Sequence, residues 1–99
     1  NIANMENAAD YAVFMDKGHV IEQGFIEELK EKYIVVSGDS EGWEHAKPLL
    51  MSGSHNRTTF EGLALSENAR ALAETGAEYA APTLQQLSVG LLKYAEEHR

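Results

Sequence analysis

The fold assigned to the second half of this chain depends on residues 57–65, RTTFEGLAL. This segment has an extended character, and a glycine inside a strand pattern marks either a break or a bulge. If Gly62 divides the segment into two strands, residues 34–81 follow the order β-α-β-β-α-β. We therefore expect an α+β protein whose main unit is a small ferredoxin-like (βαββαβ) domain followed by a terminal helix.

The elements on either side of this segment complete the predicted domain. We expect a strand at 34–36, a helix at 43–51, a helix at 67–75 that ends at Gly76, and a strand at 78–81. Pro48 removes an amide donor inside the first of these helices, so we expect a kink or a restart at Lys47. Residues 52–55, SGSH, lack the strand–elbow pattern of a catalytic serine and are interpreted as a loop.

The last helix has the clearest start signal. Thr83 and Gln86 have the spacing of a capping box, in which each side chain bonds the backbone of the other residue. Four apolar residues after the cap share one face and are expected to be buried: Leu84, Leu87, Leu91 and Tyr94.

The N-terminal third is expected to form a helix end and a β-hairpin. Residues 1–10 place Ile2, Met5 and Ala9 on one helix face. An apolar strand at 11–15, a three-residue turn at 16–18 and a return strand at 19–23 follow, with Gly24 ending the return strand. Residues 25–32 then form a connecting helix whose buried face carries Ile26, Leu29 and Tyr33.

Composition excludes several functions. The 99 residues carry a formal net charge of −8, the wrong sign for a direct nucleic-acid partner. The chain has no cysteine, so it has no disulfide framework and no thiolate metal site. No apolar run approaches the roughly 20 residues of a membrane-spanning helix, and no secretory signal is visible. Because the sequence opens within a helical pattern, we expect it to be a piece of something longer.

Individual side chains give no strong signal of chemistry. The four histidines (His19, His45, His55 and His98) have no pair at helical metal-ligand spacing. Glu44 and His45 are adjacent on a helix and cannot face each other. Trp43 is interpreted as a core anchor rather than a ligand-stacking residue. We therefore assign no catalytic, cofactor-binding or metal-binding residue.

The N-terminal elements also form an ordered series of short motifs. They are MENAAD (5–10), AVFM (12–15), DKG (16–18), VIEQG (20–24) and EEL (27–29). In this order and spacing the series resembles the segment after the H-loop histidine in the nucleotide-binding domains of ABC transporters. PTLQQL (82–87) resembles the helix that closes the ATPase subunits of drug- and peptide-exporting ABC systems. Gln85 and Gln86 replace the acids of that helix, and Ser88 replaces its Phe.

This resemblance implies the C-terminal part of an ABC transporter ATP-binding subunit, starting just after the H-loop histidine. Residues 1–24 would be the end of the nucleotide-binding domain, 25–33 a connecting helix, and 34–99 an accessory domain with a regulatory or dimer-contacting role. The parent protein would be a cytoplasmic ATPase that uses ATP and Mg²⁺ and lies at the inner face of the membrane through its permease subunits. A homo-oligomer is expected, without membrane insertion.

The piece itself is expected to be inactive. No glycine lies in a G-x-x-x-x-G-K-[ST] pattern, so the chain has no loop of backbone amides for nucleotide phosphates. A second interpretation remains open, namely a freestanding small α+β module for protein binding or dimerisation.

Overall fold

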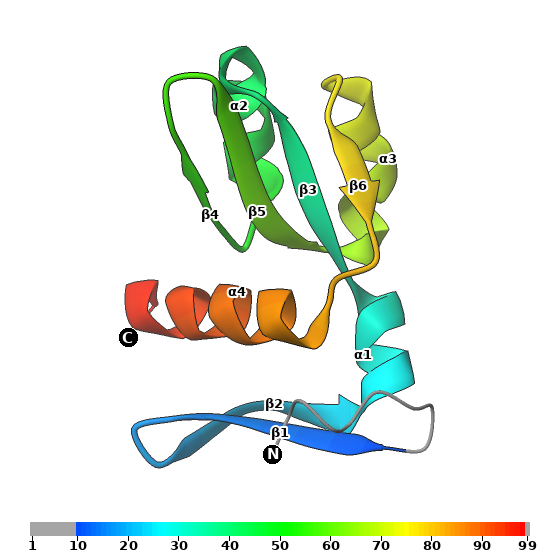
Figure 1. The fold of residues 1–99 in the computed structure, drawn as a ribbon, viewed down its shortest axis with the longest axis vertical. Helices are drawn as coiled ribbons and strands as arrows, with labels where there is room; N and C mark the ends of the chain where they lie inside the picture. Colours follow the sequence, from blue (N-terminus) through cyan, green and yellow to red (C-terminus); the bar gives the residue numbers. More distant parts are fainter. Residues whose placement is uncertain (1–9, 99) are drawn as a thin grey trace.

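A computed structural model describes residues 10–98 and confirms the α+β class, with two antiparallel sheets. A two-stranded hairpin, a helix lying across the molecule and a four-stranded sheet succeed one another along the long axis (Figure 1). The predicted helix end at residues 1–9 lies outside the described residues. The strands and α-helices are β1 (Tyr11–Asp16), β2 (His19–Phe25), α1 (Ile26–Lys32), β3 (Tyr33–Asp39), α2 (Trp43–Ala46), β4 (Ser52–His55), β5 (Thr59–Leu65), α3 (Ala69–Glu74), β6 (Glu78–Ala80) and α4 (Leu84–Glu97).

The hairpin of β1 and β2 forms where the sequence predicts it, with two differences. Asp16 pairs with His19, so the turn has two residues rather than three. Lys17 and Gly18 both have positive φ, 52° and 82°, which matches the right-handed twist of the flanking strands. Gly24 does not end β2, because it pairs with Ala12 and the strand continues to Phe25.

The four-stranded sheet corrects the interpretation of residues 52–65. Its order is β4-β5-β3-β6, and every pair is antiparallel. Gly62 does not divide its segment, because β5 runs unbroken from Thr59 to Leu65. The segment predicted as a loop, Ser52–His55, is β4 and pairs with β5. A Cβ atom on Gly62 would lie 2.6 Å from the Ser52 carbonyl oxygen, so this glycine permits close strand contact rather than a break.

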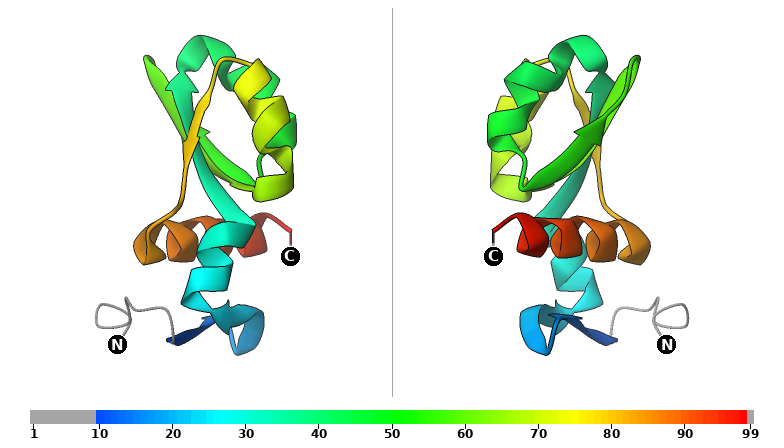
Figure 2. Two further views of the ribbon diagram at one scale, coloured as in Figure 1. Left: turned by 90° about the vertical axis from the view of Figure 1, so that its right-hand side faces the viewer. Right: turned by 90° about the vertical axis from the view of Figure 1, so that its left-hand side faces the viewer.

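One face of the sheet is covered by α2 and α3 (Figure 2). The predicted restart near Pro48 is confirmed, since α2 ends at Ala46 and a 3₁₀ turn spans Lys47–Leu49. Leu50 is already extended, so the helix does not reach Met51 as predicted. The buried residues beneath these helices form one core cluster: Ile34, Val36, Trp43, Ala46, Phe60, Ala64 and Leu72.

The C-terminal helix α4 lies between the sheet and the hairpin (Figures 1 and 2). Its capping box is confirmed, because the Gln86 amide donates to Thr83 Oγ1 at 3.1 Å and the Thr83 amide to Gln86 Oε1 at 2.9 Å. Leu84, Leu87 and Leu91 are buried as predicted, while Tyr94 is only half-buried. A second core cluster therefore joins the hairpin, α1, β3, β5 and α4: Ala12, Phe14, Ile26, Leu29, Tyr33, Leu63, Leu84, Leu87 and Leu91.

A polar contact fixes the hairpin to the start of β3. The Tyr33 hydroxyl donates to Glu22 Oε2, and Lys32 Nζ lies 3.0 Å from the same oxygen. Burial raises the pKa of the Glu22 carboxyl, but hydrogen bonds from Tyr33, Lys32 and the Gln23 amide, with the charge of Lys32, outweigh it and lower the pKa. Burial and the bond to Glu22 raise the pKa of the Tyr33 hydroxyl.

This contact predicts a component of acid sensitivity. The folded-state pKa of Glu22 lies below the unfolded value of about 4.3. Its ionised form therefore stabilises the fold above that value, and the stabilisation is lost as pH falls through the lower, folded-state pKa. Urea unfolding from pH 7 to pH 3 should show a smaller acid-induced loss of stability in Glu22→Gln than in the parent chain. Glu28→Gln, on the exposed side of α1, is the control, and equal acid loss in the parent and Glu22→Gln would contradict the prediction.

Candidate functional site

The histidines lie in three separate places. His55 stacks on the Trp43 ring at a centroid distance of 4.6 Å, and Trp43 is buried as the predicted core anchor. His19 and His98 line one depression of about 350 Å³ beside Tyr94, whose ring stacks on His98. His45 is exposed on α2. Within residues 10–98, no three His, Asp or Glu side chains are placed to hold a metal ion.

The serine-containing segment has a structural role. Ser52 Oγ donates to the carbonyl oxygen of Gly90 at 2.8 Å, which ties β4 to α4. Glu44 and His45 are both exposed on α2. Through Ser52, this segment therefore holds two elements together.

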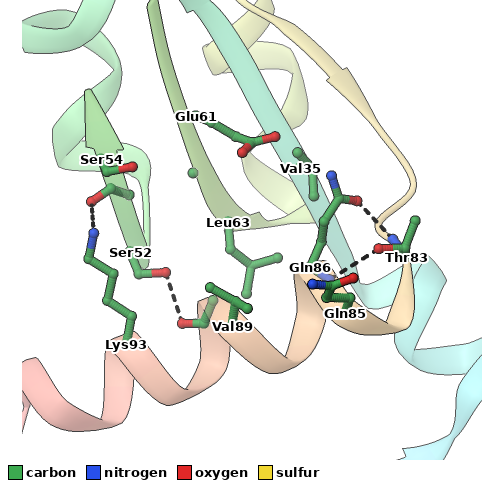
Figure 3. Close-up of a pocket in the computed structure, with 13 residues that line it drawn as sticks. Val35, Ser52, Ser54, Glu61, Leu63, Thr83, Gln85, Gln86, Val89 and Lys93 are labelled. Carbon is green, nitrogen blue, oxygen red and sulfur yellow. Dashed lines mark hydrogen bonds between the residues drawn. The ribbon is translucent and has the colours of Figure 1, made fainter. Parts of the chain in front are cut away.

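The second face of the sheet carries a groove. Helix α4 covers only the end of this face that lies next to the hairpin, and β3, β4 and β5 extend beyond it (Figure 2). The groove between α4 and these strands has a volume of about 390 Å³ (Figure 3). Such a volume lies within the roughly 300–1,000 Å³ range of small-molecule sites. Its apolar residues are Val35, Leu63 and Val89, together with three glycines.

A close contact between α4 and β5 shapes the groove. A Cβ atom on Gly90 would lie 2.9 Å from two side-chain carbons of Leu63, so a glycine is needed for the helix to approach the sheet this closely. Two hydrogen bonds also join α4 to β4, one from Ser52 to the Gly90 carbonyl and one from Lys93 to the Gly53 carbonyl. One wall of the groove is therefore held rigidly.

The polar groups of the groove come from both walls. Lys93 Nζ donates to the Gly53 carbonyl oxygen at 2.6 Å. Glu61 projects from β5 on the other side of the groove (Figure 3), and its carboxylate has no hydrogen-bond or ion-pair partner among the described residues. Gln86 Oε1 is occupied by the Thr83 amide, which leaves the Gln86 NH₂ group free to donate.

A different surface lies on the hairpin, on the side away from α4. Ala12 and Phe14 face α4 and are buried, whereas the alternate residues of β1 point outward. Five large apolar side chains on this hairpin surface are 44–54% exposed, and together they form what we call the outer hairpin face: Tyr11, Val13, Met15, Val20 and Phe25. Tyr11 and Phe25 pack edge to face, with ring centroids 5.2 Å apart.

The sequence predicted no groove, and the groove residues that it singled out, such as Thr83 and Gln86, were assigned to a helix cap. Lys93 and Glu61 are 32 positions apart and line the same groove only because α4 packs against β4 and β5. One local signal was available: Val89 and Gly90 interrupt the otherwise regular pattern of a well-capped helix. A small residue in such a position indicates a close packing partner.

Comparison with known proteins adds no relative. No protein-family model, curated protein or solved structure matches this chain. Within residues 10–98, none of the helices combines the length and the apolar character needed to cross a membrane.

Proposed function

We propose that this chain is the C-terminal part of an ABC transporter ATP-binding subunit, in which it acts as a non-catalytic regulatory or dimer-contacting piece. The parent protein couples ATP hydrolysis to transport and associates with permease subunits at the inner face of the membrane. The observation that carries the proposal is the outer hairpin face, because the resembled family packs this hairpin against the body of its nucleotide-binding domain.

The outer hairpin face has the character of a surface that packs against another. Its five apolar side chains lie on one side of a two-stranded sheet. A contiguous apolar patch of this kind commonly marks a contact with another protein surface. An isolated hairpin is also marginal in water, and packing on both sides would stabilise it further than α4 does alone.

The finer topology supports an accessory domain after the hairpin. The order β3-α2-β4-β5-α3-β6, with α2 and α3 on one face and the spatial order β4-β5-β3-β6, supports the ferredoxin-like assignment. We accordingly propose residues 1–24 as the end of the nucleotide-binding domain, 25–33 as the connection and 34–99 as the accessory domain. The core cluster shared by the hairpin and α4 would hold the accessory domain against the end of the nucleotide-binding domain.

The reading frame upstream of Asn1 tests this proposal. We expect it to encode a G-x-x-x-x-G-K-[ST] loop, a Leu-Ser-Gly-Gly signature and a histidine immediately before Asn1. An in-frame stop codon just upstream would reject the transporter assignment and favour a freestanding binding or dimerisation module.

Self-association of the isolated chain is a separate prediction. Exposed apolar surface on a hairpin recruits a second chain, so we expect a dimer or larger species in sedimentation at micromolar concentration. The contact should be the outer hairpin face, since Phe14 is already buried against α4. Met15→Lys should therefore shift the chain to a monomer of 10.9 kDa.

The control for this experiment is Tyr79→Lys, which places the same charge on an exposed apolar residue of β6. It should leave the association unchanged. A parent chain that sediments only as a 10.9 kDa species would contradict the predicted oligomer.

A further inference from the structure

We propose that the groove between α4 and the open face of the sheet binds a short peptide of two or three residues with free ends. The inference does not depend on the transporter assignment, because it rests on the shape and charges of the groove alone. Lys93 would hold the peptide carboxylate, and Glu61 would hold its ammonium group (Figure 3).

The floor of the groove suits small apolar side chains. Val35 and Leu63 are paired residues on β3 and β5, so their side chains lie next to each other on the open face. Val89 on α4 is 59% exposed, and it lines the groove rather than the core. A ligand seated here would remove this valine from water, which is favourable in proportion to the apolar area covered.

Two opposite charges flank this apolar floor. The Lys93 ammonium has three donors, and the Gly53 carbonyl occupies one of them, so the group is fixed in position and still able to bind an anion. The Glu61 carboxylate has no partner within residues 10–98 and can accept an ammonium group. A ligand with one positive and one negative end therefore complements the groove.

The separation of these charges determines the size of the ligand. The Lys93 ammonium is held at β4, the edge strand, whereas Glu61 projects from β5, one strand further in. Neighbouring strands are about 4.8 Å apart, and Figure 3 shows the two side chains on opposite sides of the groove. The Asn56 amide bonds the Thr59 carbonyl, and hydrogen-bonded pairs alternate along an antiparallel ladder, so the Gly53 carbonyl points away from β5. The Lys93 ammonium that it holds therefore lies more than one strand spacing from Glu61. This is a long span for a single α-amino acid, whose ammonium and carboxylate share one carbon atom. An extended peptide spans about 3.3–3.6 Å per residue, so two or three residues can reach both groups.

Hydrogen-bonding groups are also present for the peptide bonds of such a ligand. The Gln86 NH₂ group can donate to a peptide carbonyl, since only its oxygen is used in the capping box. Ser54 is exposed on β4 and lines the groove with a hydroxyl that can donate or accept. Two polar groups of the ligand backbone would therefore find a partner in the groove.

Calorimetric titration with the tripeptide Ala-Val-Ala tests the proposal. We expect saturable binding of the free tripeptide to the full chain. N-acetylation and C-amidation should each weaken binding about tenfold, because each removes one charge-assisted contact. Free valine should not compete. Absence of saturable binding at millimolar peptide, or equal binding of the doubly blocked peptide, would overturn the proposal.

Charge-removing variants locate the two contacts. Glu61→Gln should weaken binding of the free tripeptide about tenfold and leave binding of the N-acetylated form unaffected. Lys93→Gln should weaken binding of the free tripeptide to a similar extent and leave binding of the C-amidated form unaffected. Glu44→Gln and Lys47→Gln remove the same charges from exposed residues on the helical side of the sheet and should not change binding. Glu61 is exposed and carries no structural bond, so Glu61→Gln stays informative if Lys93→Gln loosens α4. Unchanged affinity of Glu61→Gln for the free peptide would overturn the assignment.

Discussion

Replacing Leu87 by alanine is expected to lower the free energy of unfolding by about 2–5 kcal/mol. Leu87 is 0% exposed and lies on α4 in the core cluster that joins the hairpin to the sheet. Removing its side chain leaves a cavity that cannot close unless the hairpin and the sheet both move towards α4. A domain of this size has a stability near the bottom of the usual range of about 5–15 kcal/mol, so the loss is a large part of the total.

Urea denaturation of Leu87→Ala beside Val89→Ala measures this effect. Val89 lies two residues further along the same helix and is 59% exposed, so its replacement should change stability by less than about 0.5 kcal/mol. A Leu87→Ala chain whose free energy of unfolding lies within about 0.5 kcal/mol of the parent would show that α4 does not dock as the structure places it.

Gly62→Ala is expected to destabilise the chain by about 1–3 kcal/mol through overpacking. A Cβ atom at this position would lie 2.6 Å from the Ser52 carbonyl oxygen and 2.8 Å from Leu50 Cδ1. The first of these contacts is with backbone, so β4 and β5 must separate to relieve it. The direction is informative, because a glycine-to-alanine change without steric conflict stabilises a protein by about 0.4–1 kcal/mol.

Gly42→Ala is the matched control for this substitution. The nearest atom to its added Cβ would be Phe60 Cε2 at 3.5 Å, an ordinary contact. The control should therefore be neutral or slightly stabilising. If Gly62→Ala behaves in the same way as Gly42→Ala, the close pairing of β4 with β5 is wrong.

Elements with a strong local signal were predicted closely. The capping box of Thr83 and Gln86 is formed, and the α-helix it opens begins at Leu84. Gly18 has the positive φ that the turn signal requires, and the helix after β2 buries Ile26 and Leu29 on one face as the spacing predicts. In each case the information lies within a few residues, because turns and helix caps are closed by neighbouring groups.

Elements defined by distant partners were not predicted. Residues 52–55 have little strand propensity and form β4 only because β5 pairs with them. The pattern around Gly62 predicts a break or a bulge, and the glycine is instead the point where two backbones approach each other.

Composition and local pattern therefore determined the α+β class, the hairpin and the capped final helix. The tertiary structure alone determined where that helix lies, which face of the hairpin stays exposed, and the groove that brings Lys93 opposite Glu61. The physical reason is that burial and strand pairing are satisfied by residues far apart in the chain, and no local pattern records which distant partner is used.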